Sequence, residues 1–235
     1  MVCLATVLVL VGAVALVGST FAQKPSADDS KFSLEGGLNY AGGSGINWSA
    51  PSIRLRYFVN DNIAGRLQLG IGDGIGGTPR TEEFQYAEGG TGTGIGTEKF
   101  TRMQWMVQIG GEYHLAGTDR LSPYFMLGIN LGGGSETEEW TDFDGSGYML
   151  GRSRKIMTGA SMFGFSLGAG MDFYIFENVY LGLELGLSYM TRTIKGIEDA
   201  STVGGVTTTT TGLDSKESYL GTLPMNAAFR LGWRF

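Results

Sequence analysis

The sequence predicts an all-β protein, an eight-stranded antiparallel up-and-down transmembrane β-barrel, and three observations lead to this prediction. Apolar residues recur with a period of two in eight separate segments, which is the periodicity of a strand. The connections between these segments are alternately short and long. The chain also begins with an uncharged apolar stretch, which is typical of an exported protein.

Residues 1–22 are predicted to be a signal peptide. They carry no charged side chain and end in the small-residue pattern Thr20, Phe21, Ala22, which suits cleavage after Ala22. The usual Lys/Arg start is missing, so a retained membrane anchor remains the alternative, although the flanking anchor residues of such a helix are absent. Cys3 would leave with the signal peptide, so we expect neither disulfides nor a thiolate metal site in the mature chain.

The composition differs from that of an ordinary soluble enzyme. The chain has 40 glycines in 235 residues, 17% charged residues and one histidine. The formal net charge of −6 argues against a nucleic-acid partner. The remaining length fits one domain. We therefore expect a short periplasmic N-terminal segment at residues 23–30 and the barrel at residues 31–235.

Eight segments show the alternation and have lengths near the roughly 9–11 residues of a tilted membrane strand. They are residues 32–40, 52–59, 63–71, 101–115, 121–131, 162–175, 179–189 and 227–235. Three connections are short, at residues 60–62, 116–120 and 176–178, and three are long, at about residues 73–98, 132–157 and 192–217. This asymmetry is typical of periplasmic turns and external loops, and an even strand count places both termini on the side of the short turns.

The period alone does not say which face is outside, because a soluble ligand-binding barrel would show it with the apolar face inward. Two observations indicate that the apolar face points outward, toward lipid. The apolar face carries no charge in the predicted strands, whereas the surface of a soluble barrel would need far more Lys and Glu. Aromatic residues also gather near strand ends, as membrane girdles do. These are Tyr57, Tyr113, Phe173, Trp233 and Phe235 on the short-turn side, and Tyr40, Tyr189 and Tyr219 on the other side.

With this pattern the chain resembles the small eight-stranded outer-membrane barrels of Gram-negative-type bacteria, the OmpA-, OmpX- and OmpW-like group. The resemblance covers the whole mature chain, and its most specific element is the last strand, in which Phe229, Leu231, Trp233 and Phe235 alternate up to the end. In that group such an ending is the signal read by the outer-membrane assembly machinery. The alternative is an ordinary hydrophobic strand.

The resemblance implies an integral protein of the cell outer membrane with both termini periplasmic. It implies outer-membrane lipid, lipopolysaccharide and the assembly machinery as partners, and a monomer. It also implies porin-like relatives, some of which are lipid-modifying enzymes.

The lumen of an eight-stranded barrel is narrow enough for side chains to fill it, so an open pore is not expected. Inward-facing charges lie at one level, on the order of 10 Å above the short-turn rim. They are Glu35, Arg54, Arg56, Arg66, Glu112, Asp172, Glu184 and Arg230. Because charges of both signs are present in equal number, the hypothesis is a plug of paired ions. The alternative is a hydrated lumen with loosely placed charges.

No catalytic, cofactor-binding or metal-binding residue is predicted. "GDGIGG" at 72–77 fits a dinucleotide fingerprint, but no helix pattern follows it. "DFDGSG" at 142–147 matches only part of a calcium loop and is predicted to be a turn. The single histidine, His114, is expected to face inward near a short turn, either satisfied or solvated, so Ser-His hydrolysis lacks an accessible base. An enzyme, in particular a lipid-modifying one, is the least favoured function.

Function is therefore expected in the long connections. Residues 133–147 are acidic, and residues 89–100 and 203–214 are rich in Gly and Thr, so they either extend the strands above the membrane or stay mobile. They could bind host matrix, another cell, a cation or lipopolysaccharide, or form a solvated surface with no partner. The expected role is structural or one of surface interaction, and a narrow channel for small solutes is the alternative.

Overall fold

The computed structural model describes residues 24–41, 45–72, 80–90, 92–222 and 229–235. In this part of the chain the secondary structure consists of twelve strands. They are β1 (Phe32–Ala41), β2 (Gly45–Phe58), β3 (Ile63–Gly72), β4 (Arg80–Ala87), β5 (Ile95–His114), β6 (Leu121–Phe143), β7 (Tyr148–Tyr174), β8 (Val179–Ile194), β9 (Glu198–Val203), β10 (Val206–Thr211), β11 (Ser215–Thr222) and β12 (Phe229–Arg234). These described residues include no helix of the length and apolarity needed to span a membrane.

The predicted all-β, antiparallel class is confirmed, but the predicted count of eight strands is not, since the described residues form twelve. The difference has a physical reason. The sequence pattern detects only strands with one apolar face, whereas strand pairing requires backbone hydrogen bonds and no particular side chain. Segments with polar side chains on both faces therefore pair as strands without showing the pattern.

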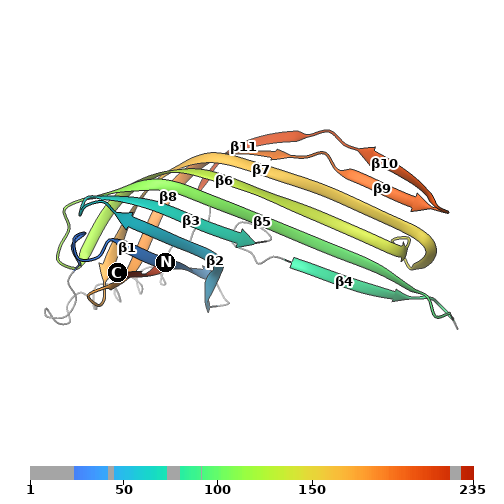
Figure 1. Ribbon diagram of the computed structural model, residues 1–235, viewed down its shortest axis with the longest axis horizontal. Helices are drawn as coiled ribbons and strands as arrows, with labels where there is room; N and C mark the ends of the chain where they lie inside the picture. The colour runs from blue at the N-terminus through green and yellow to red at the C-terminus, as the bar shows by residue number, and fades with distance from the viewer. Residues whose placement is uncertain (1–23, 42–44, 73–79, 91, 223–228) are drawn as a thin grey trace, which may run out of the picture.

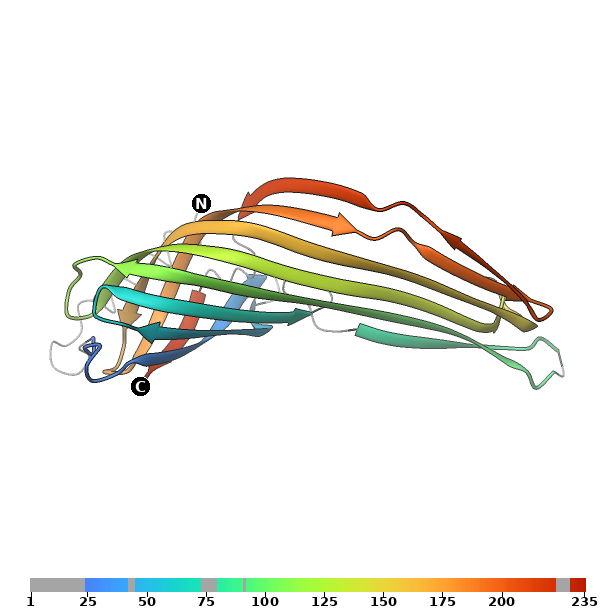
Figure 2. The ribbon, with the colours of Figure 1, turned by 45° about the horizontal axis from the view of Figure 1, so that its top comes forward.

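One continuous series of antiparallel pairs links β1, β2, β3, β5, β6, β7, β8 and β12, and we call these strands the wall. β1 pairs with β2 and with β12. From β2 the pairs continue through β3, β5, β6, β7 and β8, and β8 pairs with β12. Figures 1 and 2 show the strands curving around one another near the two termini, while β5, β6 and β7 continue far beyond the others.

The three predicted short turns are present. Residues 59–62 join β2 to β3, residues 115–120 join β5 to β6, and residues 175–178 join β7 to β8. In the first turn the Asn60 side chain accepts hydrogen bonds from the backbone N–H groups of Asn62 (2.9 Å) and Ile63 (2.8 Å). The start of β1 and the C-terminal residue lie on this side of the molecule, where the N–H of Phe32 donates to the carbonyl of Phe235 (2.9 Å; Figure 1).

Apolar side chains point away from the wall, as predicted. β12 shows the alternation clearly, because Leu231 and Trp233 are exposed whereas Arg230 and Arg234 are buried. The same outward position is found for large apolar residues of every predicted segment, among them Leu34, Leu55, Leu67, Ile109, Leu127, Leu167 and Leu181. Val107 and Phe173 are less exposed than these residues and are half-buried. The Tyr40 side chain lies outside the described residues.

Beyond the wall, six strands form one sheet in the order β4–β5–β6–β7–β9–β10. We call this the outer sheet; it consists of β4, β9 and β10 together with residues 95–103, 135–143 and 148–157 of β5, β6 and β7. The long connections predicted at 132–157 and 192–217 are therefore largely strand, and at 73–98 the described part includes β4 and the start of β5. Of the two alternatives for these connections, extension of the strands or a mobile loop, the structure shows extension of the strands.

Inward-facing glycines make room for large side chains on neighbouring strands. A Cβ atom on Gly232 would lie 2.2 Å from Cζ of Tyr180, and one on Gly170 would lie 2.4 Å from Cζ of Tyr124. Both rings are fixed by hydrogen bonds within the lumen, so they cannot move aside cheaply. The high glycine content thus allows aromatic side chains to occupy a narrow lumen.

Replacing Gly232 by Ala is expected to destabilise the fold by about 1–3 kcal/mol, because the methyl group overlaps the Tyr180 ring. Gly65→Ala is the matched control, since its Cβ meets no atom within 4 Å. The measurement is a urea titration in detergent, with the folded fraction read from heat-modifiable gel mobility. Equal midpoints for the two variants would contradict the steric explanation.

Candidate functional site

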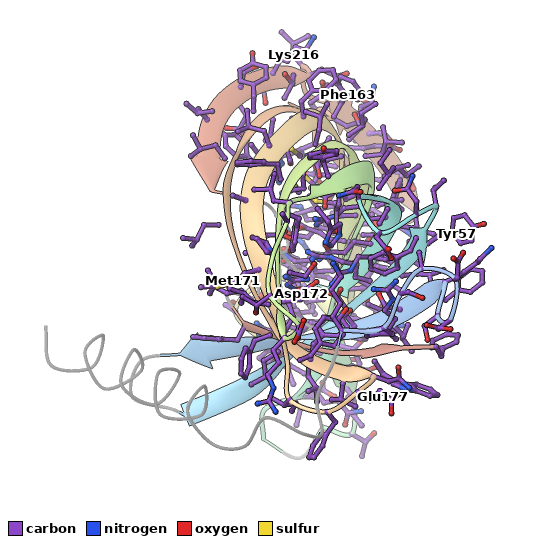
Figure 3. All side chains as sticks on the ribbon, turned by 90° about the vertical axis from the view of Figure 1, so that its left-hand side faces the viewer. Tyr57, Phe163, Met171, Asp172, Glu177 and Lys216 are labelled. Atoms are coloured by element: carbon purple, nitrogen blue, oxygen red, sulfur yellow. The ribbon has the colours of Figure 1, made fainter. Side chains whose placement is uncertain are left out.

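All eight charged residues predicted to face inward lie in the lumen. Their exposed fractions range from 0% for Arg56 to 7% for Glu184. Figure 3, seen from the end of the short turns, shows Asp172 inside the ring of strands and its chain neighbour Met171 outside, and Tyr57 also points outward. Alternate residues of one strand thus meet two different environments.

Ion pairs join these side chains across the lumen rather than only along one strand. Arg54 lies between Glu35 (3.4 Å) and Glu184 (2.9 Å). Arg66 lies between Glu184 (2.9 Å) and Glu112 (3.2 Å). Each arginine therefore links carboxylates that come from different strands.

The remaining two arginines close the circle. Arg230 lies between Glu35 (2.5 Å) and Asp172 (3.3 Å). Arg56 contacts Asp172 (2.8 Å), Glu112 (3.0 Å) and Glu35. The eight residues form a closed alternation of four arginines and four carboxylates, with Arg56–Glu35 as a cross-link, and we call this the charged ring. Every charge in it faces at least two opposite charges, so the ring is neutral as a whole.

Two buried tyrosines that the prediction missed complete the ring. The Tyr124 hydroxyl donates to Glu184 (2.6 Å) and accepts from Arg230 (2.5 Å). The Tyr180 hydroxyl donates to Glu35 (2.7 Å) and accepts from Arg56 (3.0 Å). Strand parity could have identified both, because each occupies an inward position of its alternating segment. They were missed because only charged residues were followed.

A layer of neutral polar side chains lies next to the ring. Gln68 accepts from Arg54 (2.8 Å), and Gln108 accepts from Arg66 (2.7 Å). Gln108 in turn donates to Asn130 (2.8 Å), which donates to Ser166 (2.5 Å). Further from the short turns follows a buried cluster of methionines, namely Met106, Met162 and Met190. Side chains of three kinds therefore fill successive levels of the lumen.

His114 is satisfied rather than solvated. Its Nδ1 lies 2.9 Å from Oγ of Ser122 and its Nε2 lies 3.2 Å from a carboxylate oxygen of Glu112. Ser, His and Glu in contact are the side chains of a hydrolytic triad. Here, however, all three are at most 3% exposed, and Glu112 also pairs with two arginines of the charged ring. The arrangement has no surface at which a substrate could reach the hydroxyl.

The segment before β1 lies against the short-turn end of the wall. We call residues 24–31 the N-terminal strap. The N–H of Lys24 donates to the carbonyl of Asp119 (2.6 Å), and the N–H of Ala27 donates to the Asp61 carboxylate (2.7 Å). The Arg234 guanidinium donates to the carbonyl of Ser30 (2.9 Å). The strap is thereby tied to two turns and to the last strand.

Burial of the charged ring has a cost as well as a benefit. Taking each ion out of water costs several kcal/mol, and ion pairing repays this only where the remaining polar atoms are also bonded. The Nε atoms of Arg56, Arg66 and Arg230 are buried and have no hydrogen-bond partner. The ring is therefore not optimised for stability alone, which suits a role in fixing or closing the lumen.

The other sequence motifs give no site among the described residues. Most of "GDGIGG" at 72–77 lies outside them. "DFDGSG" at 142–147 is a turn in which the Asp144 carboxylate accepts from the N–H groups of Ser146 (2.8 Å) and Gly147 (3.0 Å). These bonds, with that of the Ser146 hydroxyl, lower the pKa of Asp144. No group of three or more possible metal ligands occurs in the described part of the chain.

Comparison with known families gives one match. The model of a family described as "Outer membrane protein beta-barrel domain" matches residues 11–235. The matched range begins within the predicted signal peptide and includes every strand of the wall. Comparison with curated proteins finds no similar sequence.

Arg56→Met is expected to lower the free energy of unfolding by about 3–5 kcal/mol, because it leaves three buried carboxylates short of a counter-charge. Lys155→Met, which breaks an exposed ion pair with Glu139, is the matched control and should cost less than about 1 kcal/mol. Urea titration of both variants in the same detergent measures the difference. Similar losses would mean that the ring is solvated.

Proposed function

Because the chain belongs to the outer membrane protein β-barrel domain family, we propose that it is an integral outer-membrane protein with a closed lumen, and that its role is structural or one of surface interaction through the outer sheet. The observation that carries the proposal is the charged ring, which occupies the lumen with neutralised side chains. Membership of this family defines the fold but not the function. The function is therefore inferred from the interior and the outer surface of the barrel.

An eight-stranded wall is part of the proposal. The pairings return to β1 after eight strands: β1, β2, β3, β5, β6, β7, β8 and β12. The other four strands prolong members of this set, with β4 following β3, β9 following β8, and β10 and β11 preceding β12. An eight-stranded barrel leaves an interior that side chains can fill, which agrees with the layers found here.

The outer surface has the height of a membrane. On β6 the outward apolar residues run from Leu121 to Leu131. At about 3.4 Å per residue and a tilt of about 40°, this stretch rises roughly 26 Å, close to the apolar band of roughly 25 Å in outer-membrane barrels. Phe32, Tyr57 and Phe235 cluster at the short-turn edge of this band, with ring centroids 5.2 and 6.2 Å from Phe32. Such a cluster suits an interfacial girdle.

The orientation follows from the connections. The short turns, the start of β1 and the C-terminal residue share one side, which we assign to the periplasm, and the outer sheet projects to the cell exterior. In this position the protein would be a monomer surrounded by outer-membrane lipid and lipopolysaccharide. Its last strand, with Phe229, Leu231, Trp233 and Phe235 on the lipid face, would be the signal for the assembly machinery.

A narrow channel is the second candidate. One observation favours it: the lumen beside the charged ring is lined by amides and hydroxyls, which can bind water and small polar solutes. Enzymatic activity is not part of the proposal, because the Ser122–His114–Glu112 contact is buried and no cofactor is needed for the proposed role.

Single-channel recording tests the closed lumen. We expect the natural protein to conduct no ions in planar bilayers, and Arg56→Ala combined with Arg66→Ala to open a conducting path, because two members of the ring are removed. Arg102→Ala combined with Arg154→Ala is the control, since it removes two arginines of the outer sheet. An open natural protein with the same conductance as the ring variant would favour the channel and end the plug hypothesis.

Deletion of Phe235 tests the assembly signal. We expect the truncated protein to accumulate in the periplasm instead of the outer membrane, because the last aromatic of the β12 lipid face is lost. Phe176→Ala, which removes an exposed aromatic from the β7–β8 turn, should still assemble. Cell fractionation with heat-modifiable gel mobility measures both. Normal assembly without Phe235 would mean that β12 is an ordinary strand.

A further inference from the structure

The two faces of the outer sheet differ in composition. The face that continues the lumen side carries arginines and aromatic rings, namely Arg80, Arg102, Arg152, Arg154, Phe84, Tyr86, Phe100, Trp140 and Phe143, and we call it the inner face. The opposite face carries the lysines and most of the threonines and has no aromatic ring among the described residues, for example Lys99, Lys155, Thr97 and Thr137. Acidic residues lie on both faces, with Glu136 and Asp199 on the inner face and Glu139 on the opposite face. Strand pairing alone does not require such a separation.

Aromatic rings of the inner face lie beside cations and beside one another. The guanidinium of Arg102 lies 5.2 Å from the Phe100 ring, and that of Arg154 lies 5.1 Å from the Trp140 ring. Phe100 and Trp140 are diagonal neighbours on β5 and β6, about 7–8 Å apart. Nearer the tip, Tyr86 and Phe143 stack at 4.2 Å.

This stack depends on a glycine. Tyr86 and Phe143 come from β4 and β6, which are separated by β5, and the residue of β5 between them is Gly96. A Cβ atom there would lie 2.4 Å from the carbonyl oxygen of Asp142 and 3.5 Å from Cβ of Phe143. The two rings therefore meet over a position that has no side chain. The aromatic cluster is built into the sheet rather than being a chance contact.

Two arginines of the inner face, Arg102 and Arg154, are already paired with carboxylates of the same face. Arg102 contacts Glu136 at 2.7 Å, and Arg154 contacts Asp199 at 2.5 Å and donates to it from two nitrogens. A face neutralised in this way offers no site for a polyanion. Aromatic rings and arginines are also enriched in protein interfaces, so the composition of this face does not by itself separate a protein from a saccharide. An uncharged ligand with both apolar and hydrogen-bonding surfaces suits it best.

We propose that the inner face of the outer sheet binds a neutral saccharide chain of the glycolipid in the same outer leaflet. A pyranose ring presents a face of C–H groups that can stack on Phe100 or Trp140, and adjacent hydroxyl groups that bind in pairs to guanidinium and carboxylate groups. The ion pairs hold Arg102 and Arg154 in position, so little side-chain freedom is lost on binding. The proposal rests on the proposed function for the orientation of the sheet.

The source of the saccharide follows from the shape of the wall. β1 ends at Ala41 and β2 begins at Gly45, so the wall stops short there, and β4 and β10 form the two edges of the outer sheet. The outer sheet extends beyond the ends of β1 and β2 (Figures 1 and 2). Trp140 lies about 23 Å beyond Leu131, the top of the apolar band, at roughly 3.4 Å per residue and 40° tilt. Saccharides anchored in the same leaflet have a high effective concentration at this height.

Calorimetric titration of the full barrel in nanodiscs tests this inference. The probe is dephosphorylated oligosaccharide released by mild acid from the lipopolysaccharide of the producing cells. We expect Trp140→Leu and Arg154→Ala each to weaken binding at least about tenfold, or 1.4 kcal/mol. Thr141→Ala and Lys155→Ala, neighbours of these residues on the opposite face, should bind within about twofold of the natural protein. Heat-modifiable gel mobility confirms that each variant is folded.

A second measurement separates this inference from the proposed function. Thr141→Cys, in a chain with Cys3→Ser, should react with a membrane-impermeant maleimide on intact cells. Labelling without saccharide binding, or binding that Trp140→Leu leaves unchanged, would overturn the inference and leave the proposed orientation intact. Binding of a protein to the inner face, in place of the oligosaccharide probe, would overturn the inference as well. Absence of labelling on intact, correctly assembled protein would overturn the proposed orientation.

Discussion

The structure depends on one constraint: each wall strand must present alternate side chains to two opposite environments. Backbone groups of the wall are satisfied between strands, so no polar side chain is needed on the outside, and in lipid none is tolerated cheaply. Ionised residues of these segments therefore have only the lumen to occupy. Arg230 and Leu231, adjacent in β12, illustrate how strictly this rule separates charge from apolar surface.

The narrowness of the lumen decides what the charges do there. Side chains from opposite sides of the wall reach one another, so Arg54 can pair with Glu184, and Tyr180 can bond to Glu35. Glycine on the neighbouring strand supplies the space, as Gly232 does for the Tyr180 ring. Glycine content, buried aromatics and paired ions are thus parts of one packing solution.

The outer sheet shows a different pattern from the wall. Polar side chains lie on both of its faces, so its strands show no apolar alternation and were predicted as connections. Their side chains nevertheless separate, with Arg154 and Trp140 on one face and Lys155 and Thr141 on the other. Membrane insertion does not account for that separation, and it is the observation from which ligand binding is proposed.

The sequence by itself determined the all-β class, the outward-facing apolar side chains, the short turns and the eight members of the charged ring. Period, parity and distance from a turn are local properties, and they do not depend on which strands are neighbours. Only the tertiary structure decided the ion-pair partners, the places of Tyr124 and Tyr180, the contacts of the N-terminal strap and the length of the outer sheet. Those features arise from strand register and from contacts that join residues up to 204 positions apart in the chain.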